Sequence, residues 1–347
     1  MSKSIDRLTS QQVNRRTVFK SVGAAGIAAS PLGINRVSAQ DSMKIAFSVP
    51  GLNFPFFVHM MDLARQHVET NYPDFEFIEL DGQEGGQPSS TKQSNDIDAI
   101  IAQGVQALVI SPNDVAALAP AVQTAIDAGL VVVTVDRNVT DVATLAHVGA
   151  DNVEGGRIQG RYLLEILASG GDVIELQGQP GAAPAIDRHA GLDEIIAGQD
   201  AVKIVISQTA EFARAKAVEV LLAALQTDEA ANVAAVVCAN DDMAFGAVEA
   251  LSDAGKSVPI IGFDALPEAL QAIQEGTIAA TIEQFPGGQS TQAIDIAIAK
   301  LVDGTDPAQH DTYLTPILIT ADNLGDAERA VEAGVAPAGT PEASPSA

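Results

Sequence analysis

Four apolar runs typical of β-strands are followed directly by side chains that donate or accept hydrogen bonds. In an open α/β sheet, ligands bind in the crevice outside the carboxyl ends of the strands. Carboxylates, amides and a guanidinium group gathered there form a set of donors and acceptors that can hold a neutral polyhydroxyl compound. The residues that follow the four runs are Asp136 with Arg137, Asn240 with Asp241, Asp264, and Gln284.

Each of these residues also has a simpler interpretation, because Asp and Asn after a strand commonly cap the next helix. Asp241 fits this role best, since an apolar-periodic helix begins directly after it. Asp136 and Asp264 could also form the carboxylate pair of a glycosidase. We expect the neighbouring Arg137 to keep Asp136 ionised, which would make it unfit as a general acid.

Apolar runs recur along the chain after residue 42, separated by longer segments with helical spacing. This rhythm is typical of parallel sheets covered by helices on both faces. The number of strands exceeds what one compact sheet usually carries, so we predict two doubly wound α/β lobes, with residues 146–151 as a short segment that crosses between them. The predicted strands are 44–49, 75–80, 107–110, 130–135, 172–176, 202–206, 233–238, 258–263 and 278–282.

The composition excludes several classes of protein. The 347 residues carry 45 acidic and 19 basic side chains, which gives a formal net charge of -26 at pH 7. A nucleic-acid partner is excluded, because phosphate binding needs a basic face. One cysteine, Cys238, allows no intramolecular disulfide or multi-cysteine zinc site, and we expect it to be a small buried hydrophobe. The five histidines show no metal-ligand spacing, so no cofactor or metal is predicted.

Residues 1–39 are predicted to be a signal peptide for export. Six basic and one acidic residue precede or flank a weakly apolar stretch at 22–34. The sequence Asn-Arg-Arg-Thr-Val-Phe-Lys at 14–20 is similar to the twin-arginine export motif. Residues 37–39, Val-Ser-Ala, offer small side chains for a signal peptidase. The alternative is a flexible basic arm.

The other end of the chain has a different composition. We predict a short acidic helix after Asn323, followed by a disordered tail at 335–347 that is rich in Pro, Ala, Ser and Gly.

The sequence Ala-Gly-Lys-Ser at 254–257 resembles the end of a phosphate-binding loop, but position 250 is Ala where that motif requires Gly. We therefore predict a helix C-terminal turn there.

Several short segments place aromatic, charged and amide residues in a fixed order along the chain. They are GLNFPFF (51–57), VDRN (135–138), IELQG (174–178), IDR (186–188), AEFARAKA (210–217), CANDDMAFGA (238–247), IGFDALP (261–267) and TIEQFP (281–286). These segments resemble the motifs of the ribose-type periplasmic sugar-binding proteins, the ligand-capturing subunits of ABC importers. The resemblance runs from Lys44 to about Thr320.

The resemblance implies a fold, a function and a site. The fold is the periplasmic binding protein type I fold, with two doubly wound parallel-sheet lobes joined by a three-segment hinge. The function is capture of a monosaccharide between the lobes, followed by delivery of the sugar to a membrane permease by a monomeric, non-enzymatic protein in the periplasm or outside the cell. The ligand-binding residues that the motifs imply are Phe56, Phe57, Asp136, Arg137, Arg188, Phe212, Asn240, Asp264 and Gln284.

The same resemblance implies the limits of the lobes. The crossing segments would lie near 149–151, 284–285 and 315–317. The N-terminal lobe would comprise 43–149 with 285–315, and the C-terminal lobe 150–284 with 316–334.

Phe54 departs from the family pattern, because the ribose proteins carry an asparagine there that binds the sugar. The loss of an amide would leave a ligand hydroxyl unpaired, at a cost of about 1–3 kcal/mol. Ribose itself is therefore disfavoured, and another pentose, a deoxysugar, a polyol or a furanose form would fit better. Alternatively, Phe54 turns away into the packing of its lobe.

Two other functions remain open. A sugar-sensing subunit that presents its ligand to a chemoreceptor or kinase would have the same sequence features. A sugar-responsive regulator of the lactose-repressor type shares the core, but residues 1–42 contain no helix-turn-helix pattern and the charge is wrong for DNA.

Overall fold

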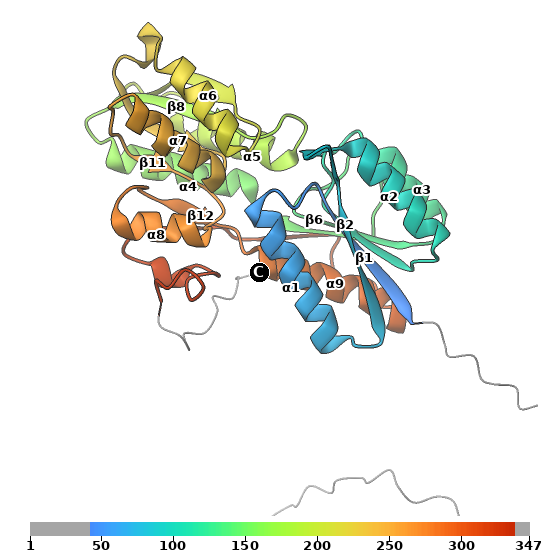
Figure 1. Cartoon of the computed structure of the whole chain (residues 1–347). Coiled ribbons are helices and arrows are strands. Elements are labelled where there is room, and N and C mark those ends of the chain that lie inside the picture. The colour runs from blue at the N-terminus through green and yellow to red at the C-terminus, as the bar shows by residue number, and fades with distance from the viewer. Residues whose placement is uncertain (1–41, 337–347) are drawn as a thin grey trace, which may run out of the picture. The chain divides into compact units, whose positions relative to one another are not determined.

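The computed structural model describes residues 42–336, in which strands and helices alternate along most of the chain (Figure 1). The helices are α1 (Pro55–Asn71), α2 (Ser90–Ala102), α3 (Ala119–Asp127), α4 (Asn152–Ile166), α5 (Ala183–Ile196), α6 (Arg214–Ala224), α7 (Asp241–Asp253), α8 (Pro267–Glu275) and α9 (Pro286–Asp303), with short 3-10 helices η1 (Asp228–Ala230) and η2 (Leu324–Asp326). The strands are β1 (Met43–Val49), β2 (Phe75–Asp81), β3 (Gln83–Glu84), β4 (Gln87–Pro88), β5 (Ala107–Ile110), β6 (Val131–Val135), β7 (Ala146–Ala150), β8 (Gly171–Gln177), β9 (Val202–Thr209), β10 (Val233–Cys238), β11 (Ile260–Ile261), β12 (Thr281–Glu283), β13 (Asp311–Leu314) and β14 (Ile317–Ile319).

The first sheet is parallel and has the strand order β13-β7-β6-β5-β1-β2. Its central strands are apolar on both faces, as expected for a sheet covered by helices on both sides. Ile45 and Phe47 pack on the face that holds α1 and α9, while Ala46 and Leu108 pack on the face that holds α2 and α3. Figure 1 shows α1 and α9 side by side, in agreement with their many contacts.

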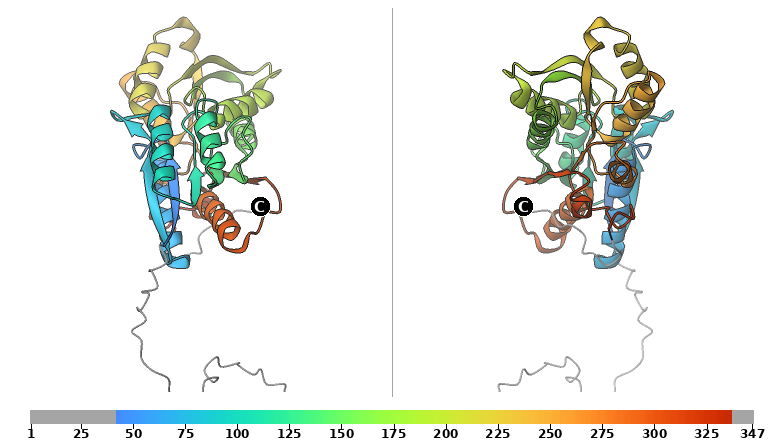
Figure 2. Two further views of the ribbon diagram at one scale, coloured as in Figure 1. Left: turned by 90° about the vertical axis from the view of Figure 1, so that its right-hand side faces the viewer. Right: turned by 90° about the vertical axis from the view of Figure 1, so that its left-hand side faces the viewer.

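The second sheet is also parallel, with the order β11-β10-β8-β9. Val173 and Val237 face Leu163 of α4 and Leu192 of α5 on one side. The alternate residues of the strands, such as Val236, pack with α6 and α7 on the other side. The side views in Figure 2 show the blue strands of the first sheet and the green and yellow elements of the second sheet in separate regions. The predicted α/β class with two doubly wound parallel sheets is confirmed.

The chain passes between the elements of the two sheets at three places. It leaves the first sheet after β7 and enters α4, returns after β12 into α9, and leaves again between β13 and β14. Strands β12 and β14 pair antiparallel with each other, beside α4. The residue limits of the two predicted lobes remain a prediction. The strands and helices do not show at which residue of a connecting loop one lobe ends and the other begins.

The structure corrects three expectations about local structure. Residues 146–150 form strand β7, which is buried along its length and pairs with β6 and β13, so their prediction as a crossing segment was wrong. The acidic helix expected after Asn323 is only the 3-10 turn η2. Val335 and Ala336, assigned to the disordered tail, pack against the hydrophobic core.

Two predictions concern residues that the structure does not describe. The signal peptide at 1–39 and residues 337–347 of the tail lie outside the described residues, so both remain predictions. Within residues 42–336, every helix is too short or too polar to cross a bilayer.

Helices α4 and α5 approach each other closely enough to require glycine. A Cβ at Gly191 would lie 1.9 Å from the Val153 carbonyl oxygen, and one at Gly156 would lie 2.1 Å from the Arg188 carbonyl oxygen. These distances mean that the helix backbones are in direct contact, since side-chain rotation cannot relieve a clash with a carbonyl. Gly156 therefore also sets the position of the α5 turn that carries Arg188.

We expect Gly191→Ala to lower the free energy of unfolding by about 1–3 kcal/mol, because the helices must separate to admit the methyl group. Urea denaturation measures the change. The matched control is Gly325→Ala, since a Cβ at Gly325 would have no atom within 4 Å. Equal stability of the two variants would show that α4 and α5 adjust without cost.

Candidate functional site

One pocket collects side chains from the ends of both sheets. All ten residues predicted from the sequence line it, and that they bind a ligand remains a prediction. The lining residues are Phe54, Phe56, Phe57, Asp136, Arg137, Pro184, Arg188, Phe212, Asn240, Asp264 and Gln284.

Pro184 is the lining residue that the sequence reasoning missed. It lies in the first turn of α5, four residues before Arg188. Residues four apart share a face of a helix, so the spacing to Arg188 was the signal that could have found it.

Three phenylalanines form one side of the pocket at the start of α1. Pro55 occupies the first turn, where its fixed φ favours helix initiation, and this places Phe54, Phe56 and Phe57 around the helix N-terminus. The rings of Phe56 and Phe57 meet edge to face, with centroids 5.1 Å apart, and Phe54 meets Phe57 in the same way at 6.2 Å. Phe54 packs on Phe57 and lines the pocket, so it does not turn wholly away into the core.

Two guanidinium groups are held among aromatic rings. Arg137 follows β6 and lies 5.4 Å from the centroid of Phe57 and 5.8 Å from that of Phe212. Arg188 of α5 lies 6.0 Å from the centroid of Phe212. Since Phe212 follows β9 and Arg137 follows β6, this ring joins the two sides of the pocket. Burial lowers the pKa of Arg137 to about 10, which leaves it cationic at neutral pH.

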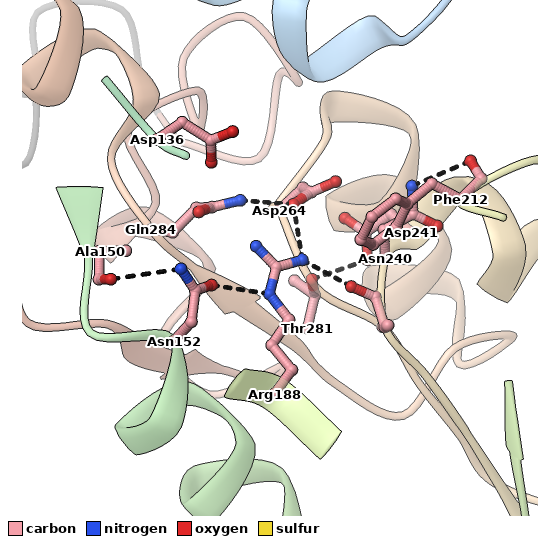
Figure 3. A network of polar contacts seen from close by, with 12 residues as sticks. Asp136, Ala150, Asn152, Arg188, Phe212, Asn240, Asp241, Asp264, Thr281 and Gln284 are labelled. Atoms are coloured by element: carbon pink, nitrogen blue, oxygen red, sulfur yellow. Dashed lines mark hydrogen bonds and ion pairs between the residues drawn. The ribbon is translucent and has the colours of Figure 1, made fainter. Parts of the chain in front are cut away.

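Arg188 is fixed by contacts on every side (Figure 3). Its Nη1 donates to the carbonyl oxygen of Ala239 at 2.6 Å, and its Nε donates to Oδ1 of Asn152 at 2.8 Å. Nη1 also lies 3.7 Å from Oδ1 of Asp264, and the guanidinium covers the ring of Phe263 at 3.5 Å. The orientation of this group is therefore set before any ligand arrives.

Asp264 and Gln284 form a second polar pair in the pocket. The Nε2 of Gln284 donates to Oδ1 of Asp264 at 2.6 Å, as Figure 3 shows. Burial raises the pKa of Asp264 to about 7, although Arg188 and Gln284 both favour its charged form. Near neutral pH, the Asp264 carboxyl group is therefore partly protonated and partly ionised. The protonated form can donate a hydrogen bond, and the ionised form can only accept one.

Asp136 is less acidic than the sequence suggested. Burial raises its pKa, and the attraction of Arg137 and Arg188 and the hydrogen bond from Ser111 offset this effect only in part. The side chain is 4% exposed, and Nε of Arg137 approaches its Oδ2 only to 3.6 Å. Arg137 favours the ionised form of Asp136, as expected, but the cost of burying the carboxylate outweighs this attraction and leaves the pKa above its ordinary value.

Asn240 caps helix α7, and Asp241 does not. The Oδ1 of Asn240 accepts from the backbone N–H of Met243 at 2.9 Å, and its Nδ2 donates to the Phe212 carbonyl oxygen at 3.2 Å. Asn240 has the extended backbone of an N-cap, whereas Asp241 is already the first helical residue. The assignment of Asp241 as the cap was therefore wrong by one position.

Strained backbone is concentrated around the pocket. Asp136, Phe212 and Asp264 all have positive φ, at 60°, 60° and 111°. Such conformations cost about 1–3 kcal/mol each outside glycine and cluster at functional sites, where the surrounding structure holds them. Here they turn the side chains at three strand ends into the pocket.

The two sides of the pocket also touch each other at its rim. The Nε2 of Gln179, which follows β8, donates to Oδ1 of Asn113, which follows β5, at 2.8 Å. The backbone N–H of Val115 donates to the Gly181 carbonyl oxygen at 3.2 Å. The Asn113 carbonyl oxygen in turn accepts from Nη1 of Arg137, so this contact reaches the pocket.

Other candidate sites have structural roles. Cys238 is buried and burial raises the pKa of its thiol, which confirms it as a small hydrophobe. Helix α7 ends at Asp253 and Gly255 has a φ of 63°, which confirms the predicted C-terminal turn. Among residues 42–336, no three His, Cys, Asp or Glu side chains are grouped so that they could hold a metal ion.

Two doubly wound sheets that line one pocket from both sides define a binding protein of the periplasmic type I class. The sequence matches the family described as "Periplasmic binding protein domain" over residues 45–306, and the chain belongs to this family. It is 35% identical to the ribose import binding protein RbsB of Bacillus subtilis (strain 168) over 254 residues, which cover 72% of this chain and 80% of that protein.

Solved structures agree with this assignment. A Caulobacter myo-inositol binding protein bound to myo-inositol has 35% sequence identity and a TM-score of 0.78, and the match covers 84% of this chain and 98% of that one. The binding protein of the arabinose ABC transporter from Shewanella sp. ANA-3, bound to α- and β-L-arabinofuranose, has 30% identity and a TM-score of 0.75 over 84% of this chain and 95% of that one. The predicted fold and resemblance are confirmed: the chain is a member of the sugar-binding, substrate-binding proteins of ABC transporters.

Proposed function

We propose that this chain captures a neutral monosaccharide or closely related polyol in the pocket and delivers it to the permease of an ABC importer. It acts as a monomer and without catalysis, outside the cytoplasm, after export by the twin-arginine route. The ten predicted residues provide the ligand contacts. The relatives support this class of ligand, since the names of three of them record ribose, myo-inositol and arabinofuranose.

The observation that carries the proposal is a pair of unpaired polar atoms in the pocket. Among the described residues, Nε of Arg137 and Oε1 of Gln284 are buried without a hydrogen-bond partner. One is a donor and the other an acceptor, and each would cost about 1–3 kcal/mol if it stayed unpaired. A ligand hydroxyl both donates and accepts, so a polyhydroxyl ligand satisfies both atoms while the phenylalanines cover its C–H faces.

The proposed mechanism is ligand-stabilised closure. The first sheet supplies Asp136 and Arg137, and the second supplies Arg188, Asn240 and Asp264, so a ligand bound to both sets holds the two sheets together. A shift from mostly open to mostly closed needs about 5.5 kcal/mol of differential affinity. About eight to ten ligand hydrogen bonds at ~0.5–1.5 kcal/mol each would supply roughly 4–15 kcal/mol, and most of this range exceeds the requirement.

Calorimetric titration of the purified protein tests the proposal. The probes are D-ribose, L-arabinose, 2-deoxy-D-ribose, xylitol and myo-inositol, with small-angle scattering measured in parallel. We expect heat of binding with at least one probe and a smaller radius of gyration with the same probe. The absence of both effects with every neutral saccharide and polyol would refute the proposed function.

Phe54→Asn is expected to move selectivity towards D-ribose. The variant restores the amide that the ribose proteins carry, and a paired hydroxyl is worth about 1–3 kcal/mol, or roughly 5- to 140-fold in affinity. The ratio of dissociation constants for D-ribose and the best wild-type ligand measures the change. Phe75→Leu, which alters a phenylalanine of β2 away from the pocket, is the control. An unchanged ratio in Phe54→Asn would show that Phe54 does not contact the ligand.

A further inference from the structure

Asp241 lies beneath the pocket and does not line it. The side chain is fully buried at the first residue of α7. Its Oδ2 accepts from the backbone N–H of Leu266 at 2.9 Å, and its Oδ1 accepts from the hydroxyl of Thr281 at 2.7 Å. Figure 3 shows Asp241 and Thr281 joined beside Asp264. The carboxylate therefore links α7, β12 and the loop between β11 and α8.

The loop that Asp241 holds has an unusual backbone. Asp264 and Ala265 follow one another with φ of 111° and 50°, a pair of conformations that L-residues rarely adopt. Three consecutive backbone N–H groups anchor this turn. That of Asp264 donates to the Ile282 carbonyl oxygen at 2.8 Å, that of Ala265 to Oγ1 of Thr281 at 3.2 Å, and that of Leu266 to Asp241.

Glycine at position 262 leaves space for the Asp241 carboxyl group. A Cβ at Gly262 would lie only 2.0 Å from Oδ1 of Asp241, so the carboxylate fits only beside glycine. Behind Gly262, Nε2 of Gln159 donates to its carbonyl oxygen at 2.9 Å and to that of Cys238 at 3.0 Å. The strand before the turn is therefore held as firmly as the turn itself.

We propose that Asp241 and Thr281 are positioning residues that hold the strained turn at Asp264–Ala265 and so aim the Asp264 carboxylate into the pocket. Without their two hydrogen bonds, the turn relaxes towards an ordinary backbone conformation, and the carboxylate leaves Gln284 and Arg188. The inference rests on the proposed function for its effect on ligand binding. It means that two residues that do not line the pocket, Asp241 and Thr281, contribute to its specificity.

Burial and hydrogen-bond chemistry support this assignment. Burial raises the pKa of Asp241 well above its ordinary value, and the nearby Asp264 raises it further. The hydrogen bonds from the Leu266 N–H and the Thr281 hydroxyl oppose this shift, because they favour the charged form. Asp241 in turn provides acceptors for both of these donors.

The first test is a double-mutant cycle on ligand binding, measured with whichever of D-ribose, L-arabinose, xylitol and myo-inositol the wild-type protein binds most tightly. Thr281→Val removes the hydroxyl at nearly constant shape and is expected to weaken binding about tenfold or more, whereas Thr281→Ser keeps the hydroxyl and the affinity within about twofold. Asp264→Ala is expected to weaken binding at least tenfold. Because Thr281 acts through Asp264, the double variant Thr281→Val/Asp264→Ala should bind no more weakly than Asp264→Ala alone. Additive losses would overturn the proposal, as would an unchanged affinity in Thr281→Val.

The second test needs no ligand. Carboxyl-detected NMR follows the titration of Asp264, assigned by its loss in Asp264→Asn. In the wild-type protein we expect a pKa of about 7, and in Thr281→Val a shift towards the ordinary value as the carboxyl group leaves its buried position. Thr281→Ser should keep the wild-type value. If Thr281→Val does not fold, Asp241→Leu replaces it, since leucine is similar in size and accepts from neither Leu266 nor Thr281. An Asp264 pKa unchanged by either variant overturns the proposal, even if no saccharide binds and the proposed function itself fails.

Discussion

Replacing Arg188 with alanine is expected to weaken ligand binding about a thousandfold. The truncation removes the hydrogen bonds to Asn152 and Ala239 and leaves Asp264 without its nearby cation. Loss of one partner from a buried charged pair costs about 2–5 kcal/mol. A charged hydrogen bond to the ligand adds about 1.5–3 kcal/mol. Since 1.4 kcal/mol corresponds to a factor of ten, about 4 kcal/mol, near the lower end of the sum of these two costs, corresponds to three orders of magnitude.

Calorimetry with the best wild-type ligand checks this result. Arg161→Ala is the matched control, because Arg161 also belongs to this half of the chain but its side chain is 51% exposed. Arg188→Lys keeps the charge and loses the planar fork that reaches Asn152 and Ala239, so it should bind more weakly than the wild type and more tightly than alanine. Urea denaturation of each variant separates loss of binding from loss of fold. An Arg188→Ala variant that binds within tenfold of the wild type would remove Arg188 from the site.

Glu283→Gln is expected to flatten the fall in stability between pH 5 and pH 8. Glu283 ends β12, just before the passage to α9, and is 1% exposed. Its oxygens accept from the backbone N–H groups of Phe285 at 2.6 Å and Glu328 at 2.8 Å. Burial, and next the negative charge of Glu328, raise the pKa of Glu283 to about 8.

The sign of the effect follows from proton linkage. A carboxyl group whose pKa rises on folding binds a proton more tightly in the native state, so its contribution to stability is greatest below the unfolded pKa near 4.5 and is lost as the pH rises to about 8. Glutamine has no such loss. Relative to wild type, Glu283→Gln should therefore gain about 2–4 kcal/mol of unfolding free energy between pH 5 and pH 8.

Urea denaturation at both pH values measures this difference. The buried Asp264, with a pKa of about 7, titrates in the same range and stays in both proteins, so the slope is reduced and not abolished. Glu328 and His59, which lies 3.3 Å from it, are also unchanged. Glu275→Gln, an exposed site at the end of α8, is the control. Parallel pH profiles for Glu283→Gln and wild type would show that Glu283 is ionised throughout this range.

The candidate site was accessible from the sequence because its residues occupy a repeated local position. Asp136, Asn240, Asp264 and Gln284 each follow an apolar strand, and ligands of α/β sheets bind outside the carboxyl ends of the strands. Asp136 follows a strand of the first sheet, Asn240 and Asp264 follow strands of the second sheet, and Gln284 follows β12. The structure gathers all four in one pocket. Their role in binding still awaits the experiments above.

Other features depended on partners far away in the chain. Strand β7 contains only one β-branched residue, and its strand character comes from pairing with β6 and with β13, about 160 residues later. The hydrogen bonds of Asp241 could not be predicted from the sequence for the same reason, since its partners Leu266 and Thr281 are distant in sequence. No local pattern records such contacts.

The sequence by itself determined the α/β class, the order of most strands and helices, and the residues at the strand ends, because periodicity and strand-end chemistry are local properties. The tertiary structure alone decided how polar groups behave once they are buried. It raised the pKa of Asp136 despite its neighbour Arg137, placed Phe54 between the core and the pocket, and put a second carboxylate behind Asp264. Burial and long-range hydrogen bonds set the energies of these groups, and both exist only after the chain has folded.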